Sequence, residues 1–224
     1  MPIRAFLFDF DGLILDTEIP SRAGWRMLYR EHGHELPDDL WATLVGTTHA
    51  PWSPMEHLEE LVGRPLDREA LTEHRRAHEL ALIEAEELRP GIIDYLAAAR
   101  RHELKRAIVS SSSRWWVDMH IARFEETVGW DAICTADGDP ARAKPAPTLY
   151  LEALRLLEVD ADEAVAFEDS PHGVRAAKAA GIFTVAVPNE VTRDLGLDAA
   201  GADLLLESLA DLPPDELLSR FAAT

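Results

Sequence analysis

The sequence predicts an α/β protein with a doubly wound parallel sheet and a helical insert after the first strand. Three observations indicate this fold. Short apolar runs recur along the chain, helix-length amphipathic stretches separate most of them, and one long interval near the N-terminus carries helical patterns alone. Continuous apolar runs are typical of strands buried on both faces, as in a parallel sheet. Their alternation with helices is the pattern of a doubly wound fold.

Six apolar runs are the expected strands, and helical stretches separate most of them. The strands are expected at residues 3–8, 106–109, 132–134, 164–167, 183–187 and 204–206. The helices are expected at 94–102, 115–124, 148–157 and 173–181, with a last short helix that begins at Pro213 and Pro214.

The interval between residues 17 and 87 shows no strand pattern. Residues 25–32, 54–62 and 68–86 have helical patterns instead, and glycines and prolines punctuate the stretches between them. We therefore expect two domains: an α/β core of residues 1–16 and 88–224, and a helical cap domain of residues 17–87. An insert that directly follows the first strand lies above the carboxyl edge of the sheet.

Composition excludes several classes of function. The chain has 224 residues, 22 Lys and Arg against 41 Asp and Glu, and a formal net charge of −19. Such acidity disfavours nucleic acid and anionic membranes, which bind basic surfaces. A single cysteine excludes an internal disulfide, and no apolar run approaches the length of a membrane-spanning helix. We expect a cytoplasmic protein, either a monomer or a homodimer, that binds neither nucleic acid nor membranes.

Two aspartates end the first expected strand. Asp9 and Asp11 are followed by Gly12, and strand alternation leaves both carboxylates on the same side. Two such charges repel by about 4 kcal/mol at ~4 Å and an effective dielectric of ~20. A divalent cation, or a protonated role for one carboxylate, relieves this repulsion. The alternative interpretation is a solvated turn, where Asp and Gly are common.

Hydroxyl groups follow the second strand, and a lysine lies in a loop stiffened by two prolines. Ser110 and Ser111 begin a run of four serines before an expected helix, whose first amides suit a phosphate. Helix capping by Ser112 or Ser113 is the alternative. Lys144 precedes a proline in a loop from which its ammonium could reach a phosphate or an aspartate, or else simply meet solvent.

Two further acids, Glu168 and Asp169, end the fourth expected strand. Mg²⁺ prefers oxygen ligands and commonly binds one or two carboxylates together with water and substrate phosphate. Asp9 and Asp169, with Glu168 behind, can supply that set. Alternatively, acids decorate a helix N-terminus because the helix dipole favours them there. Together, the acids, the hydroxyls and the lysine suit phosphoryl transfer to a carboxylate nucleophile.

The order of these motifs resembles that of haloacid dehalogenase-superfamily hydrolases. The four matching segments are residues 9–17, the apolar run ending at Ser110, Lys144 with Pro145, and residues 168–170. The likeness spans almost the whole chain. It is closest to the branch of β-phosphoglucomutases and small sugar-phosphate phosphatases, which carry a helical cap after the first motif.

The resemblance implies a role for each core residue. Asp9 would be the nucleophile that becomes an aspartyl phosphate. Asp11 would act as general acid toward the leaving alcohol and then as general base toward water. Ser110 and Lys144 would bind the phosphoryl oxygens, together with the amide of Ser111. The second aspartate argues against dehalogenation, because the dehalogenase branch lacks it.

The resemblance also implies a Mg²⁺ cofactor. The ion would be held by the carboxylates of Asp9 and Asp169 and by the backbone carbonyl of Asp11. Glu168 would act mainly through water.

The cap departs from the phosphomutases of this branch. Ser21 stands where they carry a histidine base, Val45 where they carry a lysine, and His49 where they carry an arginine. A phosphatase needs none of these three groups, because water accepts the phosphoryl group. His49 and Arg22 remain candidate substrate contacts from the cap, although a surface position is the alternative for His49.

The predicted function is therefore Mg²⁺-dependent hydrolysis of a small phosphorylated metabolite, such as a sugar phosphate, through an aspartyl phosphate. Two alternatives stay open. One is a phosphomutase of the β-phosphoglucomutase type, and the other is a non-catalytic binding or regulatory domain on the same fold.

Of Trp115 and Trp116, which follow the serine run, we expect one to pack in the core and the other to lie at the edge of the site.

Overall fold

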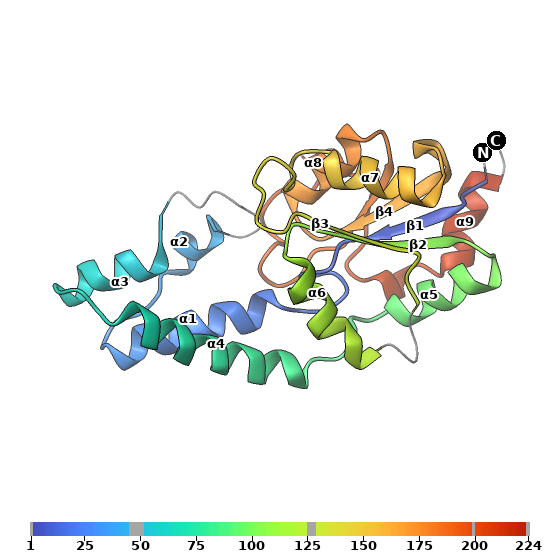
Figure 1. Cartoon of the computed structure of the whole chain (residues 1–224). Helices are drawn as coiled ribbons and strands as arrows, with labels where there is room; N and C mark the ends of the chain where they lie inside the picture. The colour runs from blue at the N-terminus through green and yellow to red at the C-terminus, as the bar shows by residue number, and fades with distance from the viewer. Residues whose placement is uncertain (1, 45–51, 125–128, 199, 223–224) are drawn as a thin grey trace.

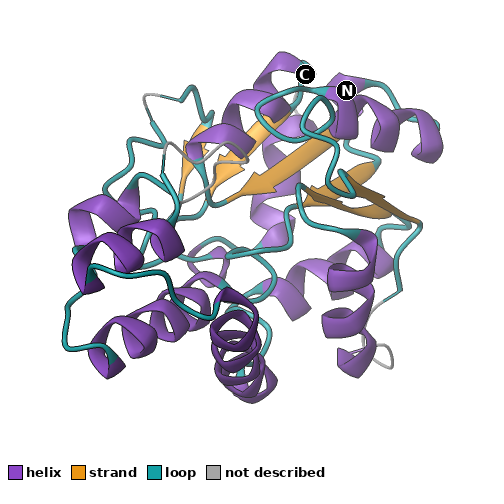
Figure 2. Cartoon of the chain, turned by 60° about the vertical axis from the view of Figure 1, so that its left-hand side comes forward, coloured by secondary structure: helices purple, strands orange, loops and turns teal. Residues whose placement is uncertain are grey.

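A parallel sheet forms the centre of the molecule. The computed structural model describes residues 2–44, 52–124, 129–198 and 200–222, and within them six strands form one sheet in the order β3-β2-β1-β4-β5-β6. Figures 1 and 2 show the sheet between layers of helices. The strands are β1 (Ala5–Phe8), β2 (Lys105–Ser110), β3 (Ala132–Thr135), β4 (Ala164–Glu168), β5 (Phe183–Ala186) and β6 (Leu204–Leu205).

Strand β1 occupies the middle of this sheet and sets the position of the site. Phe8, its last residue, pairs with Ile108 of β2 on one side and with Phe167 of β4 on the other, both in parallel. The next residue, Asp9, therefore leaves the carboxyl edge between two neighbouring strands. In open α/β sheets, ligands bind beyond this edge, at the point where the strand order changes direction.

Helices cover both faces of the sheet, as Figure 1 shows. One face carries α5 (Ile92–Arg101), α6 (Arg114–Ile121) and α9 (Pro214–Ala222), and the other carries α7 (Thr148–Leu157) and α8 (Pro171–Ala179). Alternate residues of β1 serve the two layers. Phe6 and Phe8 pack with Tyr95 of α5, whereas Leu7 packs with Tyr150 of α7. Single turns of 3-10 helix lie at Ala122–Phe124, Ala161–Glu163 and Leu209–Asp211.

Within the described residues, four helices lie between β1 and α5, the helix that packs on the sheet. They are α1 (Glu18–Glu31), α2 (Asp38–Ala42), α3 (Pro54–Val62) and α4 (Arg68–Ala85). They enclose an apolar cluster of their own, with Leu28, Tyr29, Trp41 and Leu58 at its centre. Figure 1 shows these helices to one side of the sheet. The division into a core and a cap at residues 17 and 87 stays a prediction.

The α/β fold class is confirmed, with two differences in the helical interval. Helix α1 begins at Glu18, earlier than the pattern of residues 25–32 indicated, because its first two turns bury only Pro20 and Gly24 and so show no apolar stripe. Helix α2 was not expected, and it is only five residues long. No helix in the described ranges is long and apolar enough to cross a membrane.

Candidate active site

The turn after β1 brings two carboxylates to the carboxyl edge of the sheet. The amide of Asp9 donates to the carbonyl of Phe167, 3.0 Å away, which continues the pairing of β1 with β4. Gly12 closes the turn at a φ of +80°, and a Cβ there would lie 2.2 Å from an oxygen of Asp169. Glycine is therefore required at this position by both its backbone conformation and the space available.

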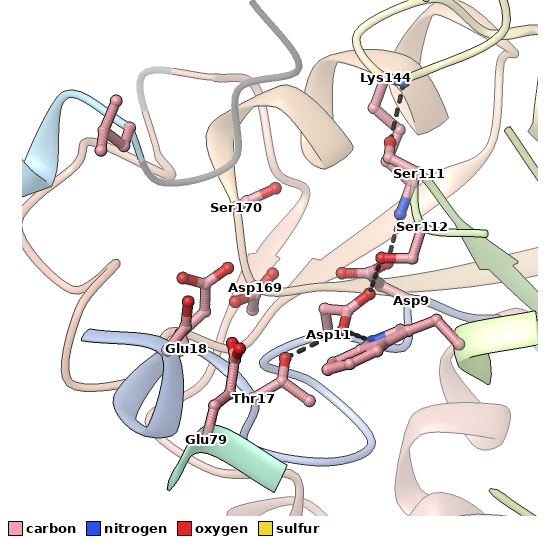
Figure 3. A pocket seen from close by; sticks show the side chains of 13 residues that line it. Asp9, Asp11, Thr17, Glu18, Glu79, Ser111, Ser112, Lys144, Asp169 and Ser170 are labelled. Carbon is pink, nitrogen blue, oxygen red and sulfur yellow. Dashed lines mark hydrogen bonds and ion pairs between the residues drawn. The ribbon is translucent and has the colours of Figure 1, made fainter. Parts of the chain in front are cut away.

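A cavity of about 320 Å³ lies between this edge and the helices that follow β1. Figure 3 shows polar side chains from both sides of it. The sheet side contributes Asp9, Asp11, Ser111, Ser112, Trp116, Lys144, Asp169 and Ser170. The helical interval contributes Thr17, Glu18, Ser21, Leu44 and Glu79.

Lys144 joins two buried acids at the base of the cavity. Its Nζ lies 2.6 Å from Asp9 Oδ1 and 2.6 Å from Glu168 Oε1, and its side chain is only 5% exposed. Burial by itself lowers the pKa of Lys144, but the carboxylates of Asp9 and Glu168 outweigh that effect, and the pKa rises. The lysine therefore stays an ammonium and places a fixed positive charge beside Asp9.

The acids at the end of β4 are buried and held by neighbours. The hydroxyl of Tyr150 donates to Glu168, and the amide of Asn189 donates to Asp169 Oδ2 over 2.6 Å. Burial, and then the charge of Asp9, raise the pKa of Glu168 to about 8 and that of Asp169 well above its ordinary value. The charged forms of these two carboxyl groups are therefore disfavoured by burial and by the repulsion from Asp9.

A divalent cation would relieve the repulsion among these carboxylates. Asp9, Glu168 and Asp169 each offer a carboxylate oxygen, and the three oxygens lie within 4.8 Å of one another. Glu168 Oε2 is buried and has no hydrogen-bond partner in the described part of the chain. An all-oxygen donor set suits a hard cation such as Mg²⁺.

Asp11 accepts hydrogen bonds from four side chains. Oδ1 accepts from Thr17 Oγ1 at 2.9 Å and from Trp116 Nε1 at 2.8 Å. Oδ2 accepts from Ser110 Oγ at 3.2 Å and from Ser112 Oγ at 2.6 Å. The carboxylate is thereby fixed at the cavity wall, close to Asp9 but satisfied by other groups.

Comparison with known proteins agrees with this geometry. The profile of haloacid dehalogenase-like hydrolases matches residues 3–181. The chain belongs to this family. Its relatives include YhcW of Bacillus subtilis (strain 168), which is 42% identical over 210 residues, or 94% of each chain.

Two further similarities bear on chemistry. Validoxylamine A 7'-phosphate phosphatase of Streptomyces hygroscopicus subsp. limoneus is 30% identical over 93% of this haloacid dehalogenase-like chain and 95% of its own. The crystal structure of CbbY from Rhodobacter sphaeroides in complex with phosphate has a TM-score of 0.71 and 31% identity, covering 94% of this chain and 96% of that one. This haloacid dehalogenase-like chain is thus an enzyme, and it has relatives named as phosphatases.

The serine run lies at the end of β2, beside Asp11. Ser110, which we expect to bind the phosphoryl oxygens, is fully buried and its hydroxyl donates to Asp11, so its contact with the phosphoryl group stays a prediction. The next serine, Ser111, lines the cavity and accepts a 3.1 Å hydrogen bond from the amide of Lys144. The reason is the extent of β2, which runs through Ser110 and leaves Ser111 as the first residue beyond the strand. Ser113 caps α6, as the capping alternative indicated.

Of the two candidate substrate contacts from the cap, Arg22 does not line the cavity. Arg22 forms a 2.7 Å ion pair with Glu190 and borders a different hollow, beside Arg26 and Met27. His49 lies outside the described residues. Ser21, which stands in place of the histidine of the phosphomutases, does line the cavity.

Four polar residues of the site were not anticipated. Glu18 and Glu79 line the cavity, while Tyr150 and Asn189 hold the acids at the end of β4. Glu18 directly follows Thr17, the last residue of the first motif. Its closeness in the sequence to Asp9 and Asp11 could therefore have indicated a position at the site. The other three come from helix α4, helix α7 and the loop after β5, and no spacing in the sequence connects them to Asp9.

Proposed function

We propose that the chain is a Mg²⁺-dependent phosphomonoester hydrolase that acts on a small phosphorylated metabolite, such as a sugar phosphate, through an aspartyl phosphate. One observation carries the proposal: the carboxylates of Asp9 and Asp11, the ammonium of Lys144 and an oxygen cluster that could hold a metal meet around one cavity. The printed names of the relatives support it, since one is a phosphatase of a phosphorylated compound and another structure holds phosphate. A cytoplasmic location, and a monomer or homodimer, stay predictions.

In the first step, an oxygen of Asp9 attacks phosphorus and the bond from phosphorus to the alcohol oxygen breaks. Asp11, protonated at that stage, donates its proton to the departing alcohol. Lys144 lies beside Asp9 and would hold the phosphoryl oxygens by charge, with Ser111 donating a hydrogen bond from the cavity wall. The products of this step are the free alcohol and phosphorylated Asp9.

In the second step, water attacks the aspartyl phosphate and the oxygen of Asp9 leaves. Asp11 now accepts a proton from that water, which restores its starting form. Inorganic phosphate departs, and Asp9 is again a carboxylate. Thr17 and Trp116 are among the residues that donate hydrogen bonds to Asp11. These donors hold the carboxyl group of Asp11 where it can act in both steps.

The cation would be held by Asp9, Asp169 and the carbonyl of Asp11, with Glu168 acting mainly through water. When bound, Mg²⁺ neutralises charge on the phosphoryl oxygens and orients the group for in-line attack. The buried, unpartnered oxygen of Glu168 supports this assignment.

The residue at position 21, on the α1 side of the cavity, favours hydrolysis over phosphomutase chemistry. Ser21 occupies the place of the histidine base of the phosphomutases and lines the cavity. A serine hydroxyl is a far weaker base than an imidazole at neutral pH, so it gives little help to a sugar hydroxyl that would accept the phosphoryl group. Water needs no such partner beyond Asp11.

The test is phosphate release from p-nitrophenyl phosphate and a panel of sugar phosphates. We expect turnover with Mg²⁺, none with EDTA, and a loss of at least about 10³-fold in Asp9→Asn, since the nucleophile is removed. Asp39→Asn, at an exposed position of α2, is the matched control and should keep the activity. Full activity in Asp9→Asn, or with EDTA, contradicts the proposal. Conversion of β-glucose 1-phosphate to glucose 6-phosphate without phosphate release would indicate the phosphomutase instead.

A further inference from the structure

The cavity has two chemically different ends. Lys144 and Ser111 lie at the end next to the sheet, where the proposed function places the phosphoryl group. Thr17, Glu18 and Glu79 lie at the other end, on α1, α4 and the turn before them, as Figure 3 shows. The part of the substrate that leaves as the alcohol must therefore face this second end.

Glu18 offers an unsatisfied carboxylate to that space. It stands at the first position of α1 and lines the cavity, and no described residue hydrogen-bonds its side chain. Burial, followed by the charges of Asp11 and Asp16, raises the pKa of Glu18 to about 7. A half-buried carboxyl group without a partner leaves hydrogen-bonding capacity unused, so a ligand that donates hydrogen bonds to it gains affinity.

Glu79 places a second carboxylate at the same end. It is 8% exposed and pairs with Arg75 one turn earlier in α4, at 2.6 Å. The guanidinium of Arg75 also lies over the ring of Trp25, 5.0 Å from its centroid, and Arg75 does not line the cavity. Arg75 is thus engaged outside the cavity, while the carboxylate of Glu79 faces the cavity.

Arg75 offsets the charge of Glu79 without lining the cavity, and no described basic residue pairs with Glu18. Among the described residues that line the cavity, Lys144 is the single basic one, against five acidic ones. A bound Mg²⁺ and one phosphoryl dianion carry opposite and equal charges, so the excess of negative charge persists in the loaded site.

We propose that the leaving-group end of this cavity selects an uncharged polyhydroxyl or an amine-bearing alcohol, and rejects one that carries a second anionic group. This inference rests on the proposed function and assigns its substrate class. Glu18 and Glu79 accept hydrogen bonds from hydroxyl or ammonium groups of the leaving alcohol. A carboxylate or second phosphate in the same place meets like charge, and one such pair at ~6 Å and an effective dielectric of ~20 is worth roughly a hundredfold.

Two matched substrate pairs test the selection. Sorbitol 6-phosphate and 6-phosphogluconate are open chains that differ by a hydroxymethyl group against a carboxylate. Glucose 6-phosphate and glucosamine 6-phosphate differ by a hydroxyl against an ammonium. We expect kcat/KM for sorbitol 6-phosphate to exceed that for 6-phosphogluconate at least tenfold, and glucosamine 6-phosphate to be used at least as well as glucose 6-phosphate at pH 8.

Variants then locate the selection in the cavity. Glu18→Gln removes the charge but keeps the size of the side chain, and the ratio of kcat/KM within the first pair should fall about tenfold. Glu79→Gln should lower the same ratio, provided that thermal unfolding shows it folded. Glu73→Gln is the control, since Glu73 is an exposed acid of the same helix that does not line the cavity, and its ratio should match the wild type.

The outcomes separate the two proposals. Equal use of sorbitol 6-phosphate and 6-phosphogluconate, beside Mg²⁺-dependent hydrolysis of p-nitrophenyl phosphate that Asp9→Asn abolishes, overturns the substrate class and leaves the phosphatase standing. A tenfold preference that persists unchanged in both Glu18→Gln and Glu79→Gln also overturns it. No phosphate release from any substrate, p-nitrophenyl phosphate included, overturns the phosphatase and this inference together.

Discussion

At the scale of single residues, the site is defined by what holds Asp11. An acid–base group must face the reacting oxygen in both steps, yet Asp11 lies at the end of a turn rather than within a strand. Its four donors come from three places: Thr17 before α1, Ser110 and Ser112 around the end of β2, and Trp116 in α6. The indole of Trp116 is the one donor that can only donate, and its hydrogen cannot rotate to another acceptor.

Trp116→Phe tests this arrangement. Phenylalanine keeps an aromatic ring, though a smaller one, and loses the N–H, so Asp11 becomes less well positioned. We expect kcat on p-nitrophenyl phosphate to fall about three- to tenfold and the pH profile of kcat to shift, because a hydrogen bond to a charged group is worth roughly 1.5–3 kcal/mol and three donors remain.

Trp115→Phe provides the matched control for that variant. Trp115 is the neighbouring residue of α6 and is 67% exposed. Its replacement should leave kcat and the pH profile as they are in the wild type. If both variants behave alike, Trp116 contributes packing only and does not position Asp11.

At the scale of elements, the sequence predicted most of the sheet but not the shape of the cavity. The strand ends were readable because a run such as 164–167 is apolar on both faces and stops at charged residues. This is why the structure brings Asp9, Lys144 and Asp169 together, as the motif order indicated.

The remaining features depend on distances across elements. Strand β2 runs through Ser110, one residue beyond the end of its apolar run, because Ser110 pairs with Thr135 of β3 and its buried hydroxyl finds Asp11 as a partner. No local sequence pattern predicts the hydrogen bond between Ser110 and Asp11. Arg22 was expected at the site, but the direction of α1 turns it toward Glu190. Helix periodicity indicates which residues share a face, not which neighbour that face meets.

Helix α6 carries a buried histidine that makes stability depend on pH. His120 is 5% exposed, its ring packs edge-on against Trp116 with centroids 4.3 Å apart, and its Nε2 has no partner in the described part of the chain. Burial lowers the pKa of His120 in the folded protein. The unfolded chain therefore binds this proton more readily, and stability falls as the pH drops below about 6.5, the ordinary pKa of histidine.

His120→Gln should reduce this loss. We expect the decrease in the urea midpoint between pH 7 and pH 5 to be smaller in the variant than in the wild type, because glutamine does not titrate. His78→Gln, at a half-buried position of α4, is the control and should follow the wild type. Equal decreases in all three proteins would show that the acid sensitivity arises from other groups.

At the scale of the whole molecule, excess negative charge opposes folding. The chain carries a formal net charge of −19, and part of it is concentrated where β1 and β4 end. Burial of Glu168 and Asp169 near Asp9 raises the pKa of both, which means that their charged forms destabilise the fold at neutral pH. A divalent cation at this point would offset the local repulsion, whereas salt screens the surface as a whole.

Mg²⁺ should therefore stabilise the protein beyond its effect on ionic strength. A ligand that binds only the folded state contributes about 2.7 kcal/mol at a hundred times its Kd, which for a chain of this length raises Tm by about 5–10 °C. We expect that difference between MgCl₂ and NaCl at matched ionic strength. Asp169→Asn should abolish the difference, because it removes a ligand, while Glu60→Gln, at an exposed position of α3, should keep it. The same shift in both variants would mean that Mg²⁺ acts by screening alone, and the oxygen cluster would not be a metal site.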